Sequence, residues 1–130
     1  MWIYPQGDPR ELSGLVLAYI GDAVYELYVR LYLLEHGAGK VNRLHTEASA
    51  LVKAASQSRF LQQLDNLLTE EERNVAKRGR NAKGSHVPKN AEVTDYRRST
   101  GFEALLGYLF LLRQEERIQE LLQFLFTRTE

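Results

Sequence analysis

Apolar residues recur at intervals of three and four along most of this 130-residue chain, and this spacing is typical of α-helices. We find no sustained two-residue alternation, and no Asn-Gly or Asp-Gly turn between β-branched runs, so strands are not expected. The fold class should therefore be all-α. A chain of this length has room for one hydrophobic core, so we expect a single compact domain over residues 1–130 with about five to seven helices.

Residues that start and end helices divide the chain into five long segments. Thr69-Glu70-Glu71-Glu72 has the pattern of a capping box and should open the third helix. Glycines at 37 and 39 should end the first. A short helical turn is expected at 41–45, before the second. The expected long helices cover about residues 11–35, 46–64, 69–80, 92–113 and 115–126.

The first helix should be long and largely buried, because apolar residues follow it at helical spacing. The fourth has a similar apolar pattern, from Phe102 to Phe110. The residues that predict the buried face of the first helix are Leu12, Leu15, Val16, Tyr19, Ala23, Leu27 and Leu31.

The composition excludes several classes of protein. There are no cysteines, so disulfides, thiolate nucleophiles and cysteine-bound zinc are ruled out, and any metal must bind to oxygen or imidazole. The longest apolar stretch, Ala104 to Leu112, is well short of the roughly 20 residues that span a bilayer. No signal-peptide pattern follows Met1. We therefore expect a cytoplasmic protein without a membrane segment.

Positive charge is concentrated in one part of a chain whose net charge is zero. The segment from Arg73 to Arg98 holds eight basic and two acidic residues. Such a segment could bind a polyanion, although a run of charge is often only a solvated face. Glycine and proline at 79, 84 and 88 predict an exposed basic loop to about residue 90.

Two acidic residues interrupt apolar helical segments. Asp22 follows Gly21 in the first helix, with Glu26 one turn later, and Glu103 lies one turn before Gly107 in the fourth. An unpaired buried carboxylate is costly, so each acid needs a partner. That partner could be an arginine or a backbone donor; alternatively, if the two helices pack together, both acids could bind a hard cation. The glycines indicate close packing, with or without a site.

Four stretches carry a resemblance to the ribonuclease III family. Residues 18–26, Ala-Tyr-Ile-Gly-Asp-Ala-Val-Tyr-Glu, resemble its signature helix, and residues 102–107, Phe-Glu-Ala-Leu-Leu-Gly, resemble its second acidic helix. Residues 78–83, Arg-Gly-Arg-Asn-Ala-Lys, and 88–90, Pro-Lys-Asn, are similar to the Mini-III branch. That branch lacks an appended double-stranded-RNA-binding domain, as expected for a chain of this length.

The resemblance implies that Asp22 and Glu103 are the catalytic residues and the metal ligands. Full-length ribonuclease III has further acids where this chain has Ala18 and Thr100. With fewer carboxylates the metal should keep more water or take ligands from RNA phosphates, which suits Mg²⁺, with Mn²⁺ as a substitute. One or two ions could act. Glu26 and Thr100 could support the site, although Glu26 could equally be a surface acid beside Arg30.

The function that the resemblance implies is metal-dependent endonucleolytic cleavage of double-stranded RNA, in maturation of 23S precursor ribosomal RNA. It also implies a two-fold homodimer and allows a ribosomal protein as a partner. One alternative is a non-catalytic RNA-binding or ribosome-assembly module with the same fold. The absence of acids at positions 18 and 100 leaves this alternative open. Another is an all-helical nucleotide hydrolase. The basic segment suits recognition of duplex RNA through phosphates, and the expected contacts are Arg78, Arg80, Asn81, Lys83 and Lys89.

Overall fold

Six α-helices and two short 3-10 helices account for most of the chain that the computed structural model describes, residues 4–36, 39–82, 87–89 and 92–128. The predicted all-α fold is confirmed. The α-helices are α1 (Gly14–His36), α2 (Val41–Val52), α3 (Ala54–Leu64), α4 (Glu70–Arg80), α5 (Val93–Leu111) and α6 (Glu115–Arg128). The 3-10 helices are η1 (Pro9–Glu11) and η2 (Asp65–Leu67).

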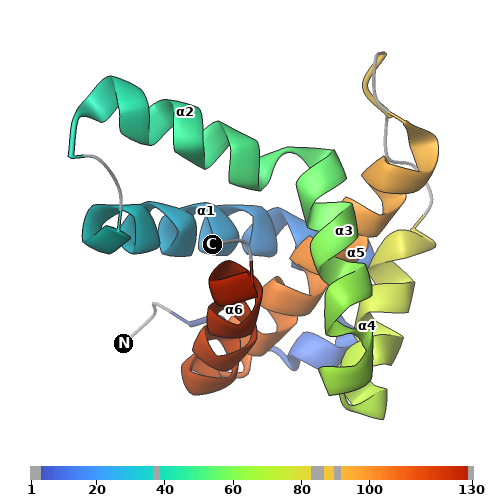
Figure 1. Cartoon of the computed structure of the whole chain (residues 1–130). Helices are drawn as coiled ribbons and strands as arrows, with labels where there is room; N and C mark the ends of the chain where they lie inside the picture. Colours follow the sequence, from blue (N-terminus) through green and yellow to red (C-terminus); the bar gives the residue numbers. More distant parts are fainter. Residues whose placement is uncertain (1–3, 37–38, 83–86, 90–91, 129–130) are drawn as a thin grey trace.

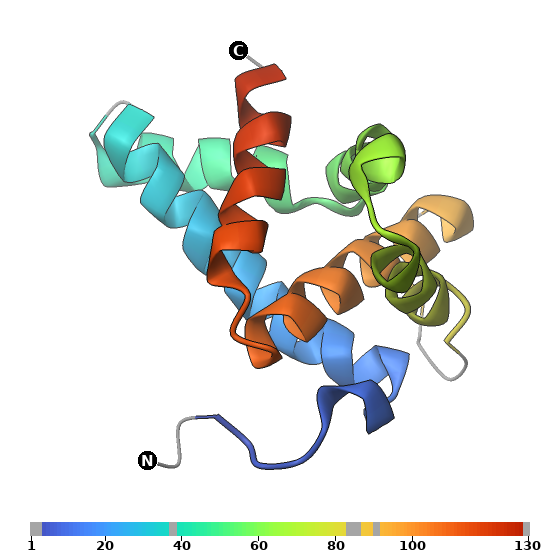
Figure 2. The same cartoon turned by 90° about the horizontal axis from the view of Figure 1, so that it is seen from below.

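Helix α5 is central to the arrangement. It packs most extensively against α1 and also contacts α3, α4 and α6. Figure 1 shows α2 running antiparallel to α1, with α3 and α4 on the opposite side of the molecule from the α1–α2 connection. Figure 2 shows α1 and α5 crossing, with α6 beside them. The site described below is built on this crossing.

An aromatic cluster joins four helices at the centre of the core. Tyr25 of α1 meets Phe102 of α5 edge-on, with ring centroids 5.0 Å apart. Phe60 of α3 lies 6.3 Å from Phe102 and 6.3 Å from Phe126 of α6, again between ring centroids. All four side chains are almost fully buried. Because aromatic rings bury large apolar areas, this cluster orients the helices that carry the acidic residues.

The buried face of α1 differs from the predicted one. The predicted residues are partly or fully exposed: Tyr19 is 78% exposed and Leu27 55%. Helix α1 is apolar on both faces, so periodicity could not tell which one faces the core. Even with this exposed stripe, no helix in the described ranges is long and apolar enough to cross a membrane. The residues of α1 that are buried in the core are Leu17, Ala18, Val24, Tyr25, Val29 and Leu33.

The single helix predicted over 46–64 is instead two helices. Lys53 separates α2 from α3 with extended backbone angles, φ −65° and ψ 154°. Side chains from the first turn of α3 satisfy the carbonyl groups at the end of α2. Ser56 Oγ donates to the Ala50 carbonyl at 2.6 Å, and Gln57 Nε2 donates to the Val52 carbonyl at 2.7 Å. The helix can break here because these donors replace helical hydrogen bonds.

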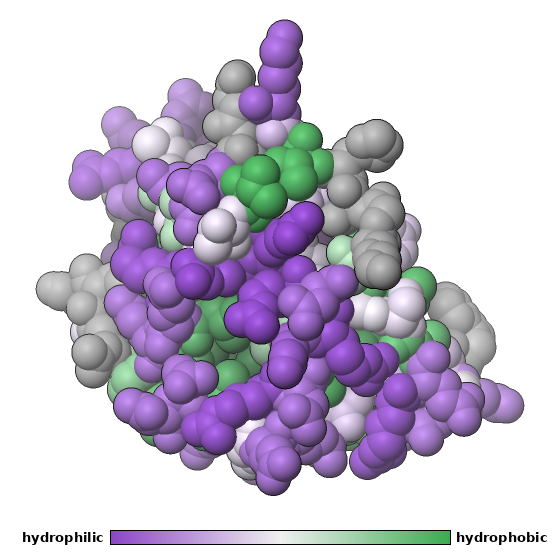
Figure 3. Space-filling model, turned by 90° about the vertical axis from the view of Figure 1, so that its right-hand side faces the viewer, coloured by the Kyte–Doolittle hydropathy of each residue, from purple (hydrophilic) through white to green (hydrophobic). Residues whose placement is uncertain are grey.

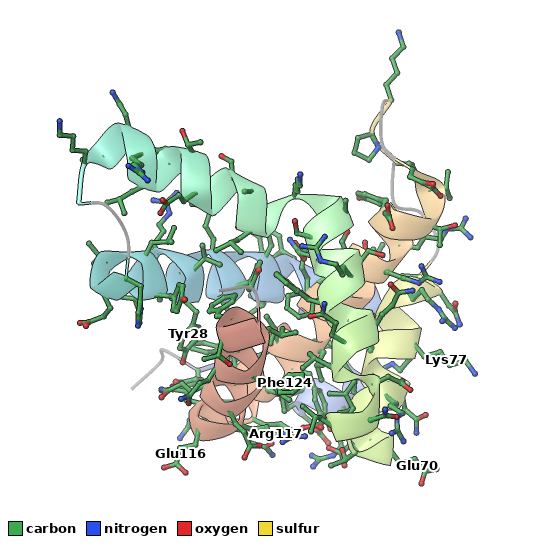
Figure 4. All side chains as sticks on the ribbon, viewed as in Figure 1. Tyr28, Glu70, Lys77, Glu116, Arg117 and Phe124 are labelled. Carbon is green, nitrogen blue, oxygen red and sulfur yellow. The ribbon has the colours of Figure 1, made fainter. Side chains whose placement is uncertain are left out.

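The capping box predicted at the start of α4 is confirmed. The Glu72 amide donates to Thr69 Oγ1 at 3.1 Å, and the Thr69 amide donates to Glu72 Oε1 at 2.9 Å. Arg117 of α6 donates to both carboxylate oxygens of Glu72, at 2.9 and 2.8 Å, and to the Leu67 carbonyl at 2.7 Å. Figure 4 shows Arg117 between α6 and the N-terminal end of α4. One carboxylate thus caps α4 and ties it to α6.

Candidate active site

The backbones of α1 and α5 touch where the helices cross. A Cβ added to Gly21 would lie 1.6 Å from the Glu103 carbonyl oxygen, and one added to Gly107 would lie 2.0 Å from the Leu17 carbonyl oxygen. Only glycine permits such an approach at these two positions. Gly21 directly precedes Asp22 and lies against Glu103, so the crossing brings the two acids together. The close packing that both glycines predicted is confirmed.

The side chains of Asp22 and Glu103 interact but differ in burial. Asp22 is exposed, whereas Glu103 is largely enclosed. Burial, and then the charge of Asp22 and a hydrogen bond with it, raise the pKa of Glu103 to about 8, while a hydrogen bond from Gln57 opposes this rise. The expectation that both acids are embedded is therefore wrong for Asp22, because its face of α1 is outside the core.

The chemistry of the acid pair fits a hard divalent cation. The charge of Asp22 contributes to the raised pKa of Glu103, and a divalent cation would offset the negative charge at this pair; oxygen is also the donor that Mg²⁺ prefers. Among the described residues, no group of three or more histidines, cysteines, aspartates or glutamates could hold a metal. A cation here would therefore have two carboxylates from the acidic residues, and other ligands from elsewhere.

The two predicted supporting residues have other partners. Glu26 Oε1 accepts from Arg30 Nη2 at 3.1 Å on the surface of α1, which was the alternative interpretation for this residue. Thr100 is buried, and its hydroxyl donates to the Tyr96 carbonyl one turn earlier at 3.0 Å. Neither interaction links the side chain to the acid pair.

Gln57 is a residue at this site that the sequence did not single out. It is 2% exposed, and it forms a hydrogen bond to Glu103. This bond favours the ionised carboxyl and so partly offsets the rise in the pKa of Glu103. Its oxygen, Oε1, is buried and has no hydrogen-bond partner among the residues that the structure describes. The only signal in the sequence was a run of polar residues, Ser56-Gln57-Ser58, all three of which are buried.

The C-terminal half of α4 lies against the same turn of α5 that carries Glu103. A Cβ added to Gly79 would lie 2.6 Å from the Ala104 Cβ and 2.9 Å from the Thr100 carbonyl oxygen. Gly79 stands between Arg78 and Arg80, so this contact fixes two basic residues next to the turn of the acid pair. Basic residues of α4 and the acid pair thus lie at the same turn of α5, although they are far apart in the sequence.

The residues predicted to contact RNA lie in different parts of the structure. Arg78 donates to the Leu12 carbonyl and is exposed, as is Arg80. Asn81 caps α4 and is exposed, and Lys89 is exposed in the segment before α5. Lys83 lies outside the described residues.

A basic groove runs between α3, α4 and α5. Four of its lining residues are Arg73, Lys77, Arg80 and Arg98. Arg73 is tied to Asp65, at 3.7 Å between Nε and Oδ1. Figure 4 shows Lys77 pointing away from α4 into solvent, and Figure 3 shows that hydrophilic residues dominate the face on this side of the molecule. Only Arg80 of these four was singled out from the sequence, because charge counting did not reveal which cations face one groove.

Comparisons with known proteins agree with this fold. The Ribonuclease III domain profile matches residues 15–114. A Mini-ribonuclease 3 from Symbiobacterium thermophilum is 52% identical over 116 residues, covering 89% of each chain, and one from Enterococcus faecalis is 50% identical over 119 residues, covering 90% of each. A crystal structure of a Fusobacterium nucleatum protein is 34% identical and superposes with a TM-score of 0.84, covering 94% of this chain and 99% of that one.

An all-helical domain with two acids at a glycine-mediated helix crossing is thus the structure of a ribonuclease III domain, a class of endoribonucleases. Within that class, the chain belongs to the Mini-ribonuclease 3 family, whose members match it over most of their length.

Proposed function

We propose that this protein is a divalent-metal-dependent endoribonuclease that hydrolyses phosphodiester bonds in double-stranded RNA. The observation that carries this proposal is the contact between Asp22 and Glu103 at the crossing of α1 and α5, within a fold whose relatives are ribonucleases. A Mg²⁺ ion bound there would activate water for attack and offset negative charge on the leaving oxygen. Mn²⁺ has similar ligand preferences and should substitute.

The chain's own residues would divide the work between two surfaces. Asp22 and Glu103 would hold the cation through their carboxylates, with the rigid α1–α5 crossing keeping the two groups in place. The exposed cations of α4 and the groove beside it would bind the phosphates of the duplex, which is how A-form RNA is mainly recognised. Because α4 packs on the turn of Glu103, duplex binding and cleavage would be adjacent.

The test is cleavage of an end-labelled RNA duplex by the purified protein, with Mg²⁺ and with excess chelator. We expect discrete cuts with Mg²⁺ and none with chelator, and no cutting of the same sequence as duplex DNA. A second substrate, a base-paired stem from precursor 23S ribosomal RNA, tests the more specific proposal that the protein matures ribosomal RNA; adding a ribosomal protein that binds this region tests for a partner. Binding of duplex without cleavage under Mg²⁺ or Mn²⁺ would favour the non-catalytic module instead.

We also propose that the protein acts as a two-fold homodimer formed through the exposed stripe of α1. Tyr19, Leu27 and Leu34 are 78%, 55% and 70% exposed, and successive members lie about two helical turns apart along α1. Soluble monomers rarely expose a continuous apolar stripe of this kind. A helix face can be self-complementary across a two-fold axis, and Asp22 beside the stripe would place two sites in one assembly.

Leu27→Asp is expected to convert the dimer to a monomer, because it would bury one charge from each copy in an apolar interface. Sedimentation velocity at micromolar concentration measures the mass directly. Leu67→Asp is a matched control, since Leu67 is also an exposed leucine, at 43%, but lies on η2. A wild-type protein that sediments as a monomer at these concentrations would contradict the dimer proposal.

A further inference from the structure

The carboxamide of Gln57 is held in one orientation. Nε2 donates to the Val52 carbonyl at 2.7 Å, and the same side chain forms a hydrogen bond to the carboxyl of Glu103. An amide nitrogen has two hydrogens, so these two acceptors use both. Because both partners are hydrogen-bond acceptors, the atom that contacts them is the amide nitrogen. The other terminal atom of the side chain is therefore the oxygen.

The remaining atom, Gln57 Oε1, is an unsatisfied acceptor in a buried place. The residue is 2% exposed, and Oε1 has no hydrogen-bond partner among the described residues. Buried polar atoms are nearly always paired, so an exception calls for a ligand or an ordered water. Oε1 shares its carbon with Nε2, which contacts Glu103, and so it lies beside the acid pair.

The charge of the site also calls for a neutral donor. The described residues offer only two carboxylates at the pair, and no third acid joins them. Two carboxylates already balance the charge of a divalent cation, so a further ligand need not be charged. A carboxamide oxygen adds a hard ligand atom without adding charge.

We propose that Gln57 is the third oxygen donor of the divalent-cation site formed by Asp22 and Glu103. This proposal rests on the proposed function, because it concerns the same cation. Gln57 has two parts in it: the nitrogen holds the Glu103 carboxyl in position, and the oxygen faces the cation or its hydration water. The helix break at Lys53 is then part of the site, since it directs the first turn of α3 toward α5.

The test is Mn²⁺ affinity in the absence of RNA, measured from the electron paramagnetic resonance signal of free Mn²⁺. Gln57→Met keeps the length of the side chain and removes both polar atoms. Gln63→Met is the matched control, because Gln63 is on the same helix and its Oε1 is likewise buried with no partner in the described part of the chain. We expect Gln57→Met to weaken Mn²⁺ binding by about tenfold or more, and Gln63→Met to leave it unchanged.

Three further measurements separate this role from a structural one. Thermal unfolding in chelator reports any loss of fold from the missing Val52 bond, independently of metal. Gln57→Glu, which restores an oxygen donor, should bind Mn²⁺ at pH 9 at least as tightly as the wild type and decides the matter if Gln57→Met does not fold. Asp22→Asn should lose Mn²⁺ binding.

Two different failures are distinguishable. If Asp22→Asn abolishes Mn²⁺ binding while folded Gln57→Met binds as tightly as Gln63→Met, the role of Gln57 is overturned and the proposed function stands. If the wild type itself binds no Mn²⁺, the metal-dependent function fails, and the role of Gln57 fails with it.

Discussion

Glu103→Gln is expected to reduce RNA cleavage on the order of a thousandfold and, in chelator, to make the protein more stable above neutral pH. The loss of activity follows because an amide is neutral and a far weaker ligand for a hard cation than a carboxylate. The gain in stability follows because the substitution removes a carboxyl group that is held in an unfavourable environment. Activity and stability are thus expected to change in opposite directions, as is common when a functional residue is kept in an environment that disfavours its ionised form.

The direction of the pH dependence follows from the pKa of Glu103. Burial and Asp22 raise it from 4.5 to about 8 in the folded protein. Between these two values the folded state keeps a proton that the unfolded chain has lost, so stability falls as pH rises and levels off above about 8. Glu103→Gln lacks this titration. Allowing for partial solvation, its advantage should grow from near zero at pH 4.5 to roughly 1–3 kcal/mol at pH 8.5.

Urea unfolding at pH 5 and pH 8.5 in chelator measures the stability, and single-turnover cleavage of the duplex with Mg²⁺ measures the activity. Asp22→Asn should show the same loss of cleavage. Glu116→Gln is the control, an exposed glutamate on α6 that points away from the site, and it should change neither quantity (Figure 4). Full cleavage by folded Glu103→Gln would contradict the proposal that Glu103 is a catalytic residue.

Gly21→Ala is expected to lower the free energy of unfolding by at least about 3 kcal/mol, and with it the midpoint of thermal unfolding by roughly 10 °C. The added Cβ would lie 1.6 Å from the Glu103 carbonyl oxygen and 2.9 Å from the Gly107 nitrogen. Both are backbone atoms of a central helix, so no flexible side chain can move aside. The helices would have to separate, and the contact between α1 and α5, the most extensive one between the described helices, would loosen.

Gly7→Ala is the matched control for this prediction, since a Cβ at residue 7 would meet no atom of the described residues within 4 Å. It should change stability by less than about 0.5 kcal/mol. Denaturation followed by circular dichroism compares the three proteins. An unfolding midpoint for Gly21→Ala equal to that of Gly7→Ala would show that the crossing can widen at little cost, and would remove the reason for glycine at this position.

Much of the local structure could be read from the sequence because it depends on neighbouring residues. Helical spacing predicted the extents of α1, α4, α5 and α6 to within about three residues. Thr69 and Glu72 predicted the start of α4, since a capping box uses only groups within one turn. The break at Lys53 was missed because no glycine or proline marks it. It depends on Ser56 and Gln57 reaching back to carbonyls of the preceding helix, which propensities do not describe.

The sequence by itself determined that the protein is helical. Its motifs placed it in the ribonuclease III family and made Asp22 and Glu103 the candidate catalytic residues. Only the tertiary structure decided which face of α1 is buried, that Glu103 is enclosed while Asp22 is exposed, and that Gln57 lies beside them. The physical reason is that burial and pKa depend on atoms brought close by packing. Residues 22, 57 and 103 are far apart in the chain, and the backbone contact at Gly21 and the Phe60–Phe102 packing bring their three helices together.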